Sequence, residues 1–338
     1  MTATHTTDVA IIGAGPVGLF AIFECGMLGF KSHVIDTLDM VGGQCTALYP
    51  EKPIYDIPGF PSVMAGDLID NLEEQAAPFS PHYHLKEQVV GMEKNGEVWH
   101  LTLTSGTTID AKAVIIAAGV GAFGPNRPPL EGLEEYEDKS VFYMVKKRED
   151  FRDKTVVIAG GGDSAVDWAV SLSELAKKIY VVHRRPKFRA APDMVSKMQK
   201  LHDDGVIEIV TPYQLGGLKG QKGQLEAVIV KDLDNNEREL KADTLLPFFG
   251  LSMNLGPIAE WGLNLDHNHI VVDPKTCATN LEGIYAIGDI MTYENKLKLI
   301  LSGFAEGAQA AHAIRKQMFP DQVFHFEYST TQGVPGDQ

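Results

Sequence analysis

Cysteine is scarce in this chain, with only Cys25, Cys45 and Cys277 among 338 residues. No two of them form a Cys-x-x-Cys pair, which excludes a zinc ribbon and a redox dithiol within the chain, and their odd number does not suit a disulfide framework. Cys45 is therefore expected to be a small buried side chain. Long apolar runs and a basic, then apolar, leading segment are also absent. These absences predict a cytoplasmic protein that neither spans a membrane nor is secreted.

Positive charge is the second shortage. The chain has 30 Lys and Arg against 45 Asp and Glu, a formal net charge of −15 at pH 7. This balance disfavours wholesale binding to nucleic acid or to an anionic membrane. Residues 139–200 are the exception, with fourteen basic and seven acidic residues. That segment is suited to binding anions. Separately, the length of the chain suggests two domains.

Two similar glycine-rich stretches lie 147 residues apart: VAIIGAGPVG at residues 9–18 and VVIAGGGDSA at residues 156–165. In each, an apolar run leads through a glycine turn into a segment with apolar residues at helical spacing. This pattern opens a βαβ nucleotide-binding unit, so the sequence predicts two such units. Glycine turns without a ligand are the alternative, but both copies stand between a predicted strand and a predicted helix.

The first stretch has the spacing of a dinucleotide-binding loop. Gly13 allows the tight turn, Gly15 lets the backbone approach a pyrophosphate, and Gly18 lets helix and strand pack closely. Asp36 ends the next predicted strand, eighteen residues after Gly18, where a carboxylate would bind a ribose hydroxyl. In the second stretch the corresponding positions are Gly160, Gly162 and Ala165.

The second unit differs from the first at the ribose position. Adding the offset of 147 to Asp36 gives His183, followed by Arg184 and Arg185. A carboxylate there would repel a 2'-phosphate, whereas guanidinium groups bind one through paired hydrogen bonds. The sequence thus predicts NADP(H) rather than NAD(H), with a solvated basic turn as the alternative.

Two dinucleotide sites in one chain usually hold FAD and a nicotinamide cofactor. The sequence predicts a short apolar strand ending in Gly-Asp over residues 281–289 and a helix over about residues 303–317. The amino end of that helix would face the flavin edge on which negative charge develops. Taken alone, Gly-Asp is also a common turn.

The chain resembles the pyridine nucleotide-disulfide oxidoreductases of the low-molecular-weight thioredoxin reductase type. The matching landmarks span nearly the whole chain: the two glycine stretches, Gly42-Gly43-Gln44, Pro58-Gly59-Phe60, Ala117-Ala118-Gly119, His183-Arg184-Arg185 with Arg189, and residues 283–289. Thioredoxin reductases of this shape have a Cys-x-x-Cys just before the second glycine stretch. Residues 141–151 occupy that position here and contain no cysteine, so the chain cannot pass electrons to a disulfide by thiol exchange.

Three segments resemble a different subfamily, the thioredoxin-reductase-like ferredoxin–NADP reductases. They are residues 43–52, residues 55–60 and a tail containing residues 324–330. That resemblance implies a homodimer in which an NADPH domain is inserted in a discontinuous FAD domain and the tail of one subunit covers the flavin of the other. It implies these FAD contacts: Asp36 to the adenosine ribose, Val89 to the adenine, Gln44 and Tyr49 to the flavin half, Phe123 beside the flavin, Asp289 to the ribitol and Thr330 to the ring edge. Tyr55 and Tyr328 would flank the ring as catalytic residues.

Several of these assignments have alternatives. Tyr55 and Phe123 could be ordinary core aromatics, and Val89 a plain strand residue. His325 or Phe326 could replace Tyr328 in the tail.

The expected fold is α/β, with two Rossmann-like three-layer domains: residues 1–122 and 247–338 for FAD, and residues 123–246 for NADP(H). The expected activity is electron transfer between NADP(H) and ferredoxin or flavodoxin, by hydride transfer to flavin N5 and two one-electron steps. The alternatives are an NADPH-dependent reductase of a low-molecular-weight disulfide or a thioredoxin-like acceptor, and a non-enzymatic NADPH sensor. No metal is expected. A basic cluster is the expected docking surface for ferredoxin, and a solvated charged face is the alternative. The cluster comprises Lys146, Lys147, Arg148, Arg152 and Lys154. Lys296 and Lys298 are the second candidates for docking.

Overall fold

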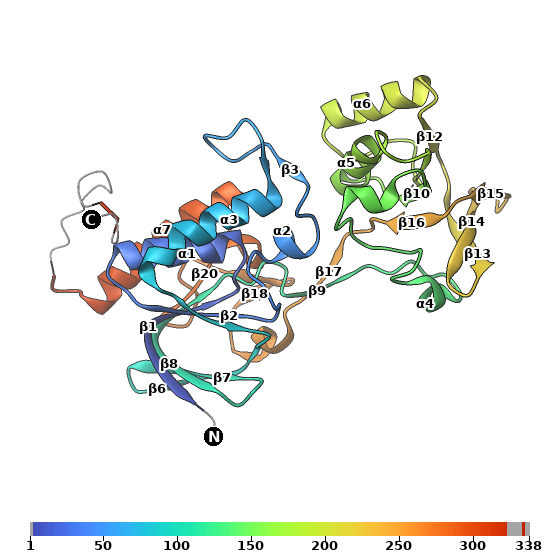
Figure 1. The fold of residues 1–338 in the computed structure, drawn as a ribbon. Helices are drawn as coiled ribbons and strands as arrows, with labels where there is room; N and C mark the ends of the chain where they lie inside the picture. Colours follow the sequence, from blue (N-terminus) through green and yellow to red (C-terminus); the bar gives the residue numbers. More distant parts are fainter. Residues whose placement is uncertain (1–2, 323–332, 335–338) are drawn as a thin grey trace. The chain divides into compact units, whose positions relative to one another are not determined.

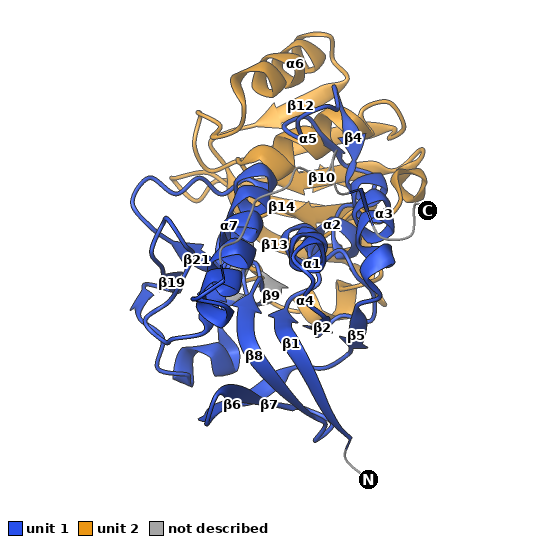
Figure 2. Cartoon of the chain, turned by 90° about the vertical axis from the view of Figure 1, so that its left-hand side faces the viewer, with its two compact units in different colours: residues 1–123, 253–338 blue, residues 124–252 orange. Residues whose placement is uncertain are grey.

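The computed structural model describes residues 3–322 and 333–334. The chain forms two compact units, one of residues 1–123 and 253–338 and the other of residues 124–252 (Figure 2). The second unit is thus inserted in the first along the chain. The changes of unit fall after Phe123 and after Ser252, whereas proline and glycine positions placed the domain limits after residues 122 and 246.

A seven-stranded sheet forms the centre of unit 1, in the order β5-β2-β1-β8-β7-β6 with β20 also paired to β8. Strands β5, β2, β1, β8 and β20 are parallel, while β6, β7 and β8 form an antiparallel meander. Strand β8 takes part in both because it is long: its first half pairs with β7 and its last residues with β20. The bounds are β1 (Thr4–Ile12), β2 (Ser32–Asp36), β5 (His82–Leu85), β6 (Val89–Asn95), β7 (Val98–Leu103), β8 (Thr108–Ile116) and β20 (Ile284–Ala286).

Helices α1 (Pro16–Met27), α3 (Ala65–Ala76) and α7 (Ile300–Met318) lie together on one side of the parallel strands, with β6 and β7 on the other side (Figure 1). Helix α1 directs Leu19 and Ile22 into the core, one helical turn apart, and both are almost fully buried. Burying such side chains stabilises the folded state by about 1.5–3 kcal/mol each. Unit 1 therefore has the three layers predicted from the sequence.

Shorter elements complete unit 1. Two small sheets, β3-β4 and β18-β19-β21, lie outside the central one. The bounds are α2 (Gln44–Ala47), β3 (Pro53–Ile54), β4 (Val63–Met64), η1 (Ala77–Phe79), η3 (Gly256–Glu260), β18 (Leu265–Asp266), β19 (His269–Val271), η4 (Gly288–Ile290) and β21 (Met291–Thr292).

Unit 2 repeats this plan on a smaller scale. Its parallel sheet has the order β12-β11-β10-β16, and a separate antiparallel sheet has the order β13-β14-β15. The side chains of β10 are buried from Val156 onward, as expected of a strand covered on both faces. The bounds are α4 (Leu133–Tyr136), η2 (Arg148–Phe151), β10 (Thr155–Ala159), α5 (Asp163–Leu172), β11 (Lys178–Val182), α6 (Pro192–Asp203), β12 (Ile207–Val210), β13 (Gln214–Gln221), β14 (Gln224–Lys231), β15 (Glu237–Lys241) and β16 (Thr244–Pro247).

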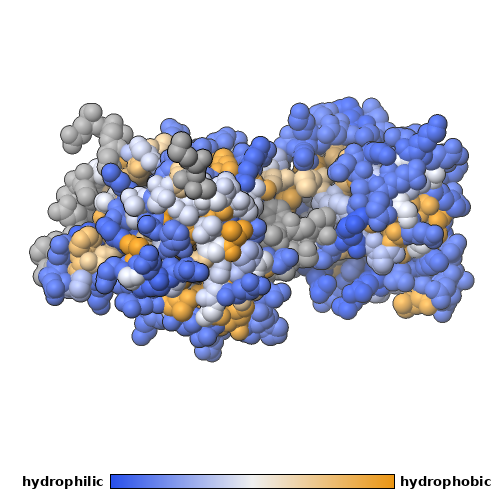
Figure 3. Space-filling model, turned by 90° about the horizontal axis from the view of Figure 1, so that it is seen from below, coloured by the Kyte–Doolittle hydropathy of each residue, from blue (hydrophilic) through white to orange (hydrophobic). Residues whose placement is uncertain are grey.

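Strands β9 (Ala122–Pro125) and β17 (Leu251–Asn254) pair with each other where the chain passes between the units. The predicted α/β class with two Rossmann-like units is confirmed. In the described part of the chain, no helix is both long and apolar enough to cross a bilayer. The face shown in Figure 3 is mainly hydrophilic, with small and separate apolar patches.

Candidate functional site: a nucleotide pocket and a second glycine loop

Unit 1 contains a cavity of about 290 Å³ at the carboxyl ends of β1, β2 and β8. In open α/β sheets this edge, beside the glycine turn, is where ligands bind. The cavity brings together residues from eight separate segments of the sequence. Seven of the predicted FAD contacts line it: Gly13, Gly15, Asp36, Gln44, Tyr49, Val89 and Asp289.

The three glycines of the first loop have different surroundings. Gly13 has φ +111°, and a β-carbon there would collide with the carbonyl oxygen of Ala117 at the end of β8. A β-carbon on Gly18 would collide with the carbonyl oxygen of Gly13. Around Gly15, by contrast, a β-carbon would meet nothing within 4 Å. Gly13 and Gly18 therefore keep loop, helix and strand in close contact, while Gly15 leaves the backbone open to a ligand.

Helix α1 begins directly at the cavity. Its N-cap is Gly15, which supplies no side-chain hydrogen bond, and Pro16 occupies the first turn. The first N–H groups of the helix are therefore without a side-chain acceptor from the cap, and the helix dipole adds partial positive charge there. No acidic residue lies in that first turn. This end of the cavity is suited to an anion such as a phosphate.

Asp36 links the glycine loop to the end of β2. Its Oδ2 accepts a hydrogen bond from the N–H of Ala14 at 2.7 Å, and its Oδ1 accepts one from the N–H of Leu38 at 2.9 Å. Burial raises the pKa of the Asp36 carboxyl, while these backbone hydrogen bonds oppose the rise. Each oxygen has a further lone pair, so the carboxylate can also accept hydrogen bonds from hydroxyl groups in the cavity.

All three cysteines are buried and free. Cys45 is the one that lines the cavity, and burial raises its pKa to about 11. Burial raises the pKa of Cys25 and of Cys277 to about 12. Because the thiolate is the reactive form, none of these thiols is an effective nucleophile near neutral pH. The expectation that Cys45 is a small buried side chain is confirmed.

A buried ion pair behind the Gly288-Asp289 turn was not expected from the sequence. The side chains of Lys296 and Glu306 are each 3% exposed, and Lys296 Nζ lies 2.6 Å from Glu306 Oε1. The same carboxylate accepts hydrogen bonds from the Gly288 N–H at 2.9 Å and the Tyr293 hydroxyl at 3.1 Å. Helix α7 thus holds in place the turn that directs Asp289 to the cavity. Lys296 as a docking candidate is therefore wrong, because its side chain is buried and paired.

The glycine loop of unit 2 matches the first in shape. A β-carbon on Gly160 would lie 2.6 Å from the carbonyl oxygen of Phe248 at the end of β16, and one on Gly162 would meet nothing within 4 Å. Ala165 is fully buried in α5. Gly160 and Gly162 therefore have surroundings similar to those of Gly13 and Gly15, as the offset of 147 predicts.

The basic segment of unit 2 folds back onto this loop. The N–H of Arg189 donates to the Gly161 carbonyl at 2.7 Å, and the side chains of Arg184, Arg185 and Arg189 are exposed. His183 is buried, and its ring lies where a side chain on Gly161 would be. Burial lowers the pKa of His183, and the neighbouring guanidinium charges act in the same direction. His183 thus packs beneath the loop, while the arginines remain available at the surface.

Of the predicted FAD-site residues, Gly18 and Tyr55 do not line the cavity, and three others fall on residues or side chains outside the described structure. Tyr55 is 65% exposed and does not line the cavity. Tyr328 and Thr330 lie outside the described residues, as does the side chain of Phe123.

Comparison with known proteins agrees with this geometry. The family model for pyridine nucleotide-disulphide oxidoreductases matches residues 7–314. The chain belongs to this family. Relatives in the family include a ferredoxin–NADP reductase of Paramagnetospirillum magneticum, 60% identical over 98% of this chain and 99% of the relative. Another is a ferredoxin–NADP reductase of Rhodospirillum rubrum, 59% identical over 98% of this chain and 97% of the relative.

Solved structures share this fold. Thioredoxin reductase of T. acidophilum is 25% identical, with a TM-score of 0.82 over 93% of this chain and 99% of that one. A bacillithiol disulfide reductase of Staphylococcus aureus, 18% identical, matches in fold with a TM-score of 0.76 over 93% of this chain and 99% of that one. The family predicted from the glycine loops and the Gly-Asp strand is confirmed.

We predict that Glu306→Gln weakens the Gly288-Asp289 turn. The substitution leaves the Lys296 charge buried without its counter-ion, which should lower the free energy of unfolding by about 3 kcal/mol. Chemical denaturation measures this loss. Glu260→Gln is the control, because Glu260 is exposed in the same unit. An unfolding free energy equal to that of the parent would show that the pair does not support the turn.

Proposed function

We propose that this chain is a ferredoxin–NADP reductase that uses FAD. The observation that carries the proposal is the combination of two intact nucleotide loops with the absence of a reactive thiol. Relatives about 60% identical over nearly the full chain, named ferredoxin–NADP reductases, support the same activity. A two-electron donor and a one-electron acceptor need only a redox cofactor between them, so the chain requires no nucleophile.

The cavity in unit 1 is the proposed FAD site. The open backbone at Gly15 and the amino end of α1 suit the pyrophosphate, and the free lone pairs of Asp36 suit the ribose. When bound, FAD supplies hydride acceptance from NADPH and the release of single electrons. The chain's part is to hold and orient it. The other proposed contacts are Gly13, Gly18, Gln44, Tyr49, Val89, Phe123, Asp289 and Thr330, with Tyr55 and Tyr328 flanking the ring.

The glycine loop of unit 2 is the proposed NADP(H) site. Gly162 is open at the amino end of α5, and Gly160 and Ala165 keep the loop close to the sheet. Among the described residues, no acidic side chain pairs with Arg184 or Arg185, so both guanidinium groups are available for a 2'-phosphate. Arg189 would add a third positive charge, and His183 supports the loop from beneath.

Ferredoxin, or flavodoxin, is the proposed electron acceptor. Fewer basic residues are available to bind it than the sequence suggested. Arg148 pairs with Glu174 at 2.7 Å, and Arg152 pairs with Glu149 at 2.7 Å. Lys146 and Lys147 are exposed, and no ion pair of theirs occurs in the described part of the chain. These two lysines are therefore the proposed docking charges. A homodimer in the cytoplasm, with no nucleic-acid or membrane partner, remains part of the proposal.

Reduction of a low-molecular-weight disulfide is the second candidate, because bacillithiol disulfide reductases share the fold. Such a reaction through a protein thiol would need an accessible, acidic cysteine. Burial of Cys25, Cys45 and Cys277, with their raised pKa values, disfavours it.

Reciprocal substitutions test the assignment of the two nucleotide sites. Arg184→Ala or Arg185→Ala should each weaken NADPH use by about ten- to a hundredfold and leave NADH use nearly unchanged, because one lost charge-assisted contact contributes about 1.5–3 kcal/mol. Asp36→Asn should instead reduce flavin retention without changing the preference for NADPH. The measurements are kcat/KM for both nucleotides and the flavin-to-protein absorbance ratio.

Lys241→Ala is the matched control for the arginine variants, because Lys241 is an exposed cation in the same unit. Equal losses for NADPH and NADH would contradict the 2'-phosphate contact. An altered nucleotide preference in Asp36→Asn, with full flavin content, would mean that the two sites are reversed.

We also predict that removing both charges in Lys146→Ala with Lys147→Ala raises the KM for ferredoxin several-fold at low ionic strength. Exposed charges steer association, and salt screens them beyond about 8–10 Å, so the difference should fade as salt is added. NADPH oxidation by a small uncharged dye should stay unchanged. If the double variant reduces ferredoxin like the parent at low salt, docking uses another surface, and Lys298 is the next candidate.

A further inference from the structure

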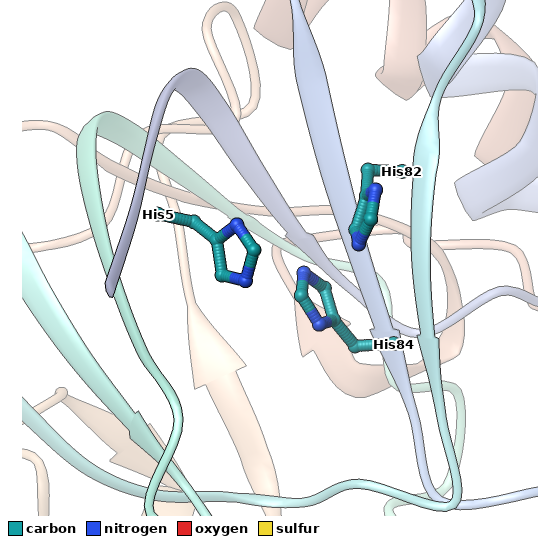
Figure 4. Close-up of side chains that lie close together, drawn as sticks. All are labelled: His5, His82 and His84. Carbon is teal, nitrogen blue, oxygen red and sulfur yellow. The ribbon is translucent and has the colours of Figure 1, made fainter. Parts of the chain in front are cut away.

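Four histidines gather on three neighbouring strands of unit 1. They are His5 on β1, His33 on β2, and His82 and His84 on β5. Their ring centroids lie 4.6–5.4 Å apart in all six pairs. Three of them, His5, His82 and His84, bring one ring nitrogen each to within 4.8 Å of the others. Figure 4 shows these three rings turned toward a common point from two separate strands.

Nothing in the fold requires this convergence. The strands are already paired by backbone hydrogen bonds, with His33 opposite His82 and Ile35 opposite His84. A single ring-to-ring hydrogen bond, His33 Nδ1 to His84 Nε2 at 2.9 Å, is formed within the described group. None of the four lines the cofactor cavity, so the proposed FAD site does not use them.

The chemistry of the group matches a transition-metal site. Neutral imidazole is a preferred ligand of zinc and of neighbouring first-row metals, and zinc–nitrogen bonds are about 2.0–2.1 Å long. Two ligands on a tetrahedral ion are then roughly 3.4 Å apart, so nitrogens within 4.8 Å need only small side-chain rotations to bind.

We propose that His5, His82 and His84 bind one divalent transition-metal ion of the zinc class, with His33 hydrogen-bonded beside them. The ion would join β1 to the edge strand β5 across β2, which ties the first strand of the chain to the rim of the sheet. Three protein ligands leave one tetrahedral position to solvent, where His82 is exposed. Because the site is separate from the cavity, a structural role follows and no step of electron transfer depends on it.

Zinc binding to the full-length, flavin-loaded protein tests this proposal. After chelation and dialysis against ZnCl₂, elemental analysis should find one zinc per chain, and zinc should raise the unfolding temperature. His5→Ala and His82→Ala should each weaken binding by tenfold or more and abolish the thermal shift. His82 is exposed, so its replacement should leave folding and flavin content intact.

His267→Ala is the matched control, because His267 is an exposed histidine far along the chain and outside the group. It should bind zinc and respond to it like the parent. The proposal is overturned if the parent retains no zinc after dialysis. It is also overturned if His5→Ala and His82→Ala bind zinc as tightly as the parent, since the metal would then lie elsewhere.

Discussion

The close approach of a glycine turn to the end of a parallel strand is the constraint on which both units depend. In unit 1 the backbone of Gly13 packs against the carbonyl of Ala117, and in unit 2 Gly160 packs against the carbonyl of Phe248. This contact brings the amino end of the following helix to the edge of the sheet. The free N–H groups of that helix end are suited to an anion, and the residues at or just after the end of the next strand are the proposed neighbours of that anion. In the proposed assignment, selectivity between the units depends on whether that neighbour is Asp36 or the Arg184-Arg185 pair.

The absence of reactive sulfur limits what the reaction can be. Family members with a dithiol pass electrons from flavin to disulfide, but each cysteine here is buried with a raised pKa. The proposed reaction is therefore direct exchange between a bound flavin and an external acceptor. Such exchange makes positioning the main task of the protein, and the buried Lys296–Glu306 pair serves it by holding the Gly288-Asp289 turn.

Much of the fold was predictable because the spacing of glycines in each loop is typical of a strand–turn–helix in a nucleotide-binding unit. The spacing of Gly13, Gly15 and Gly18 and the exact repeat at 147 residues indicated two Rossmann-like units, and the Gly-Asp strand indicated the far wall of the cavity. The buried Lys296–Glu306 pair and the histidine group were not predicted, because both depend on contacts between distant segments. Glu306 lies between Gly303 and Gly307 on the buried face of α7. A charged residue on that face was the sequence feature that could have indicated the buried ion pair. The histidine group needs three strands to be paired in register before its members meet.

The most direct test of the account is ferredoxin-dependent reduction of cytochrome c by the purified flavoprotein with NADPH, measured beside thiol formation from thioredoxin and from a low-molecular-weight disulfide. The account predicts two cytochromes reduced per NADPH consumed, in a reaction that requires ferredoxin or flavodoxin, and no thiol above background. Thiol formation at a rate equal to or above cytochrome reduction would contradict it, because the electrons would then leave the flavin as a pair to a disulfide.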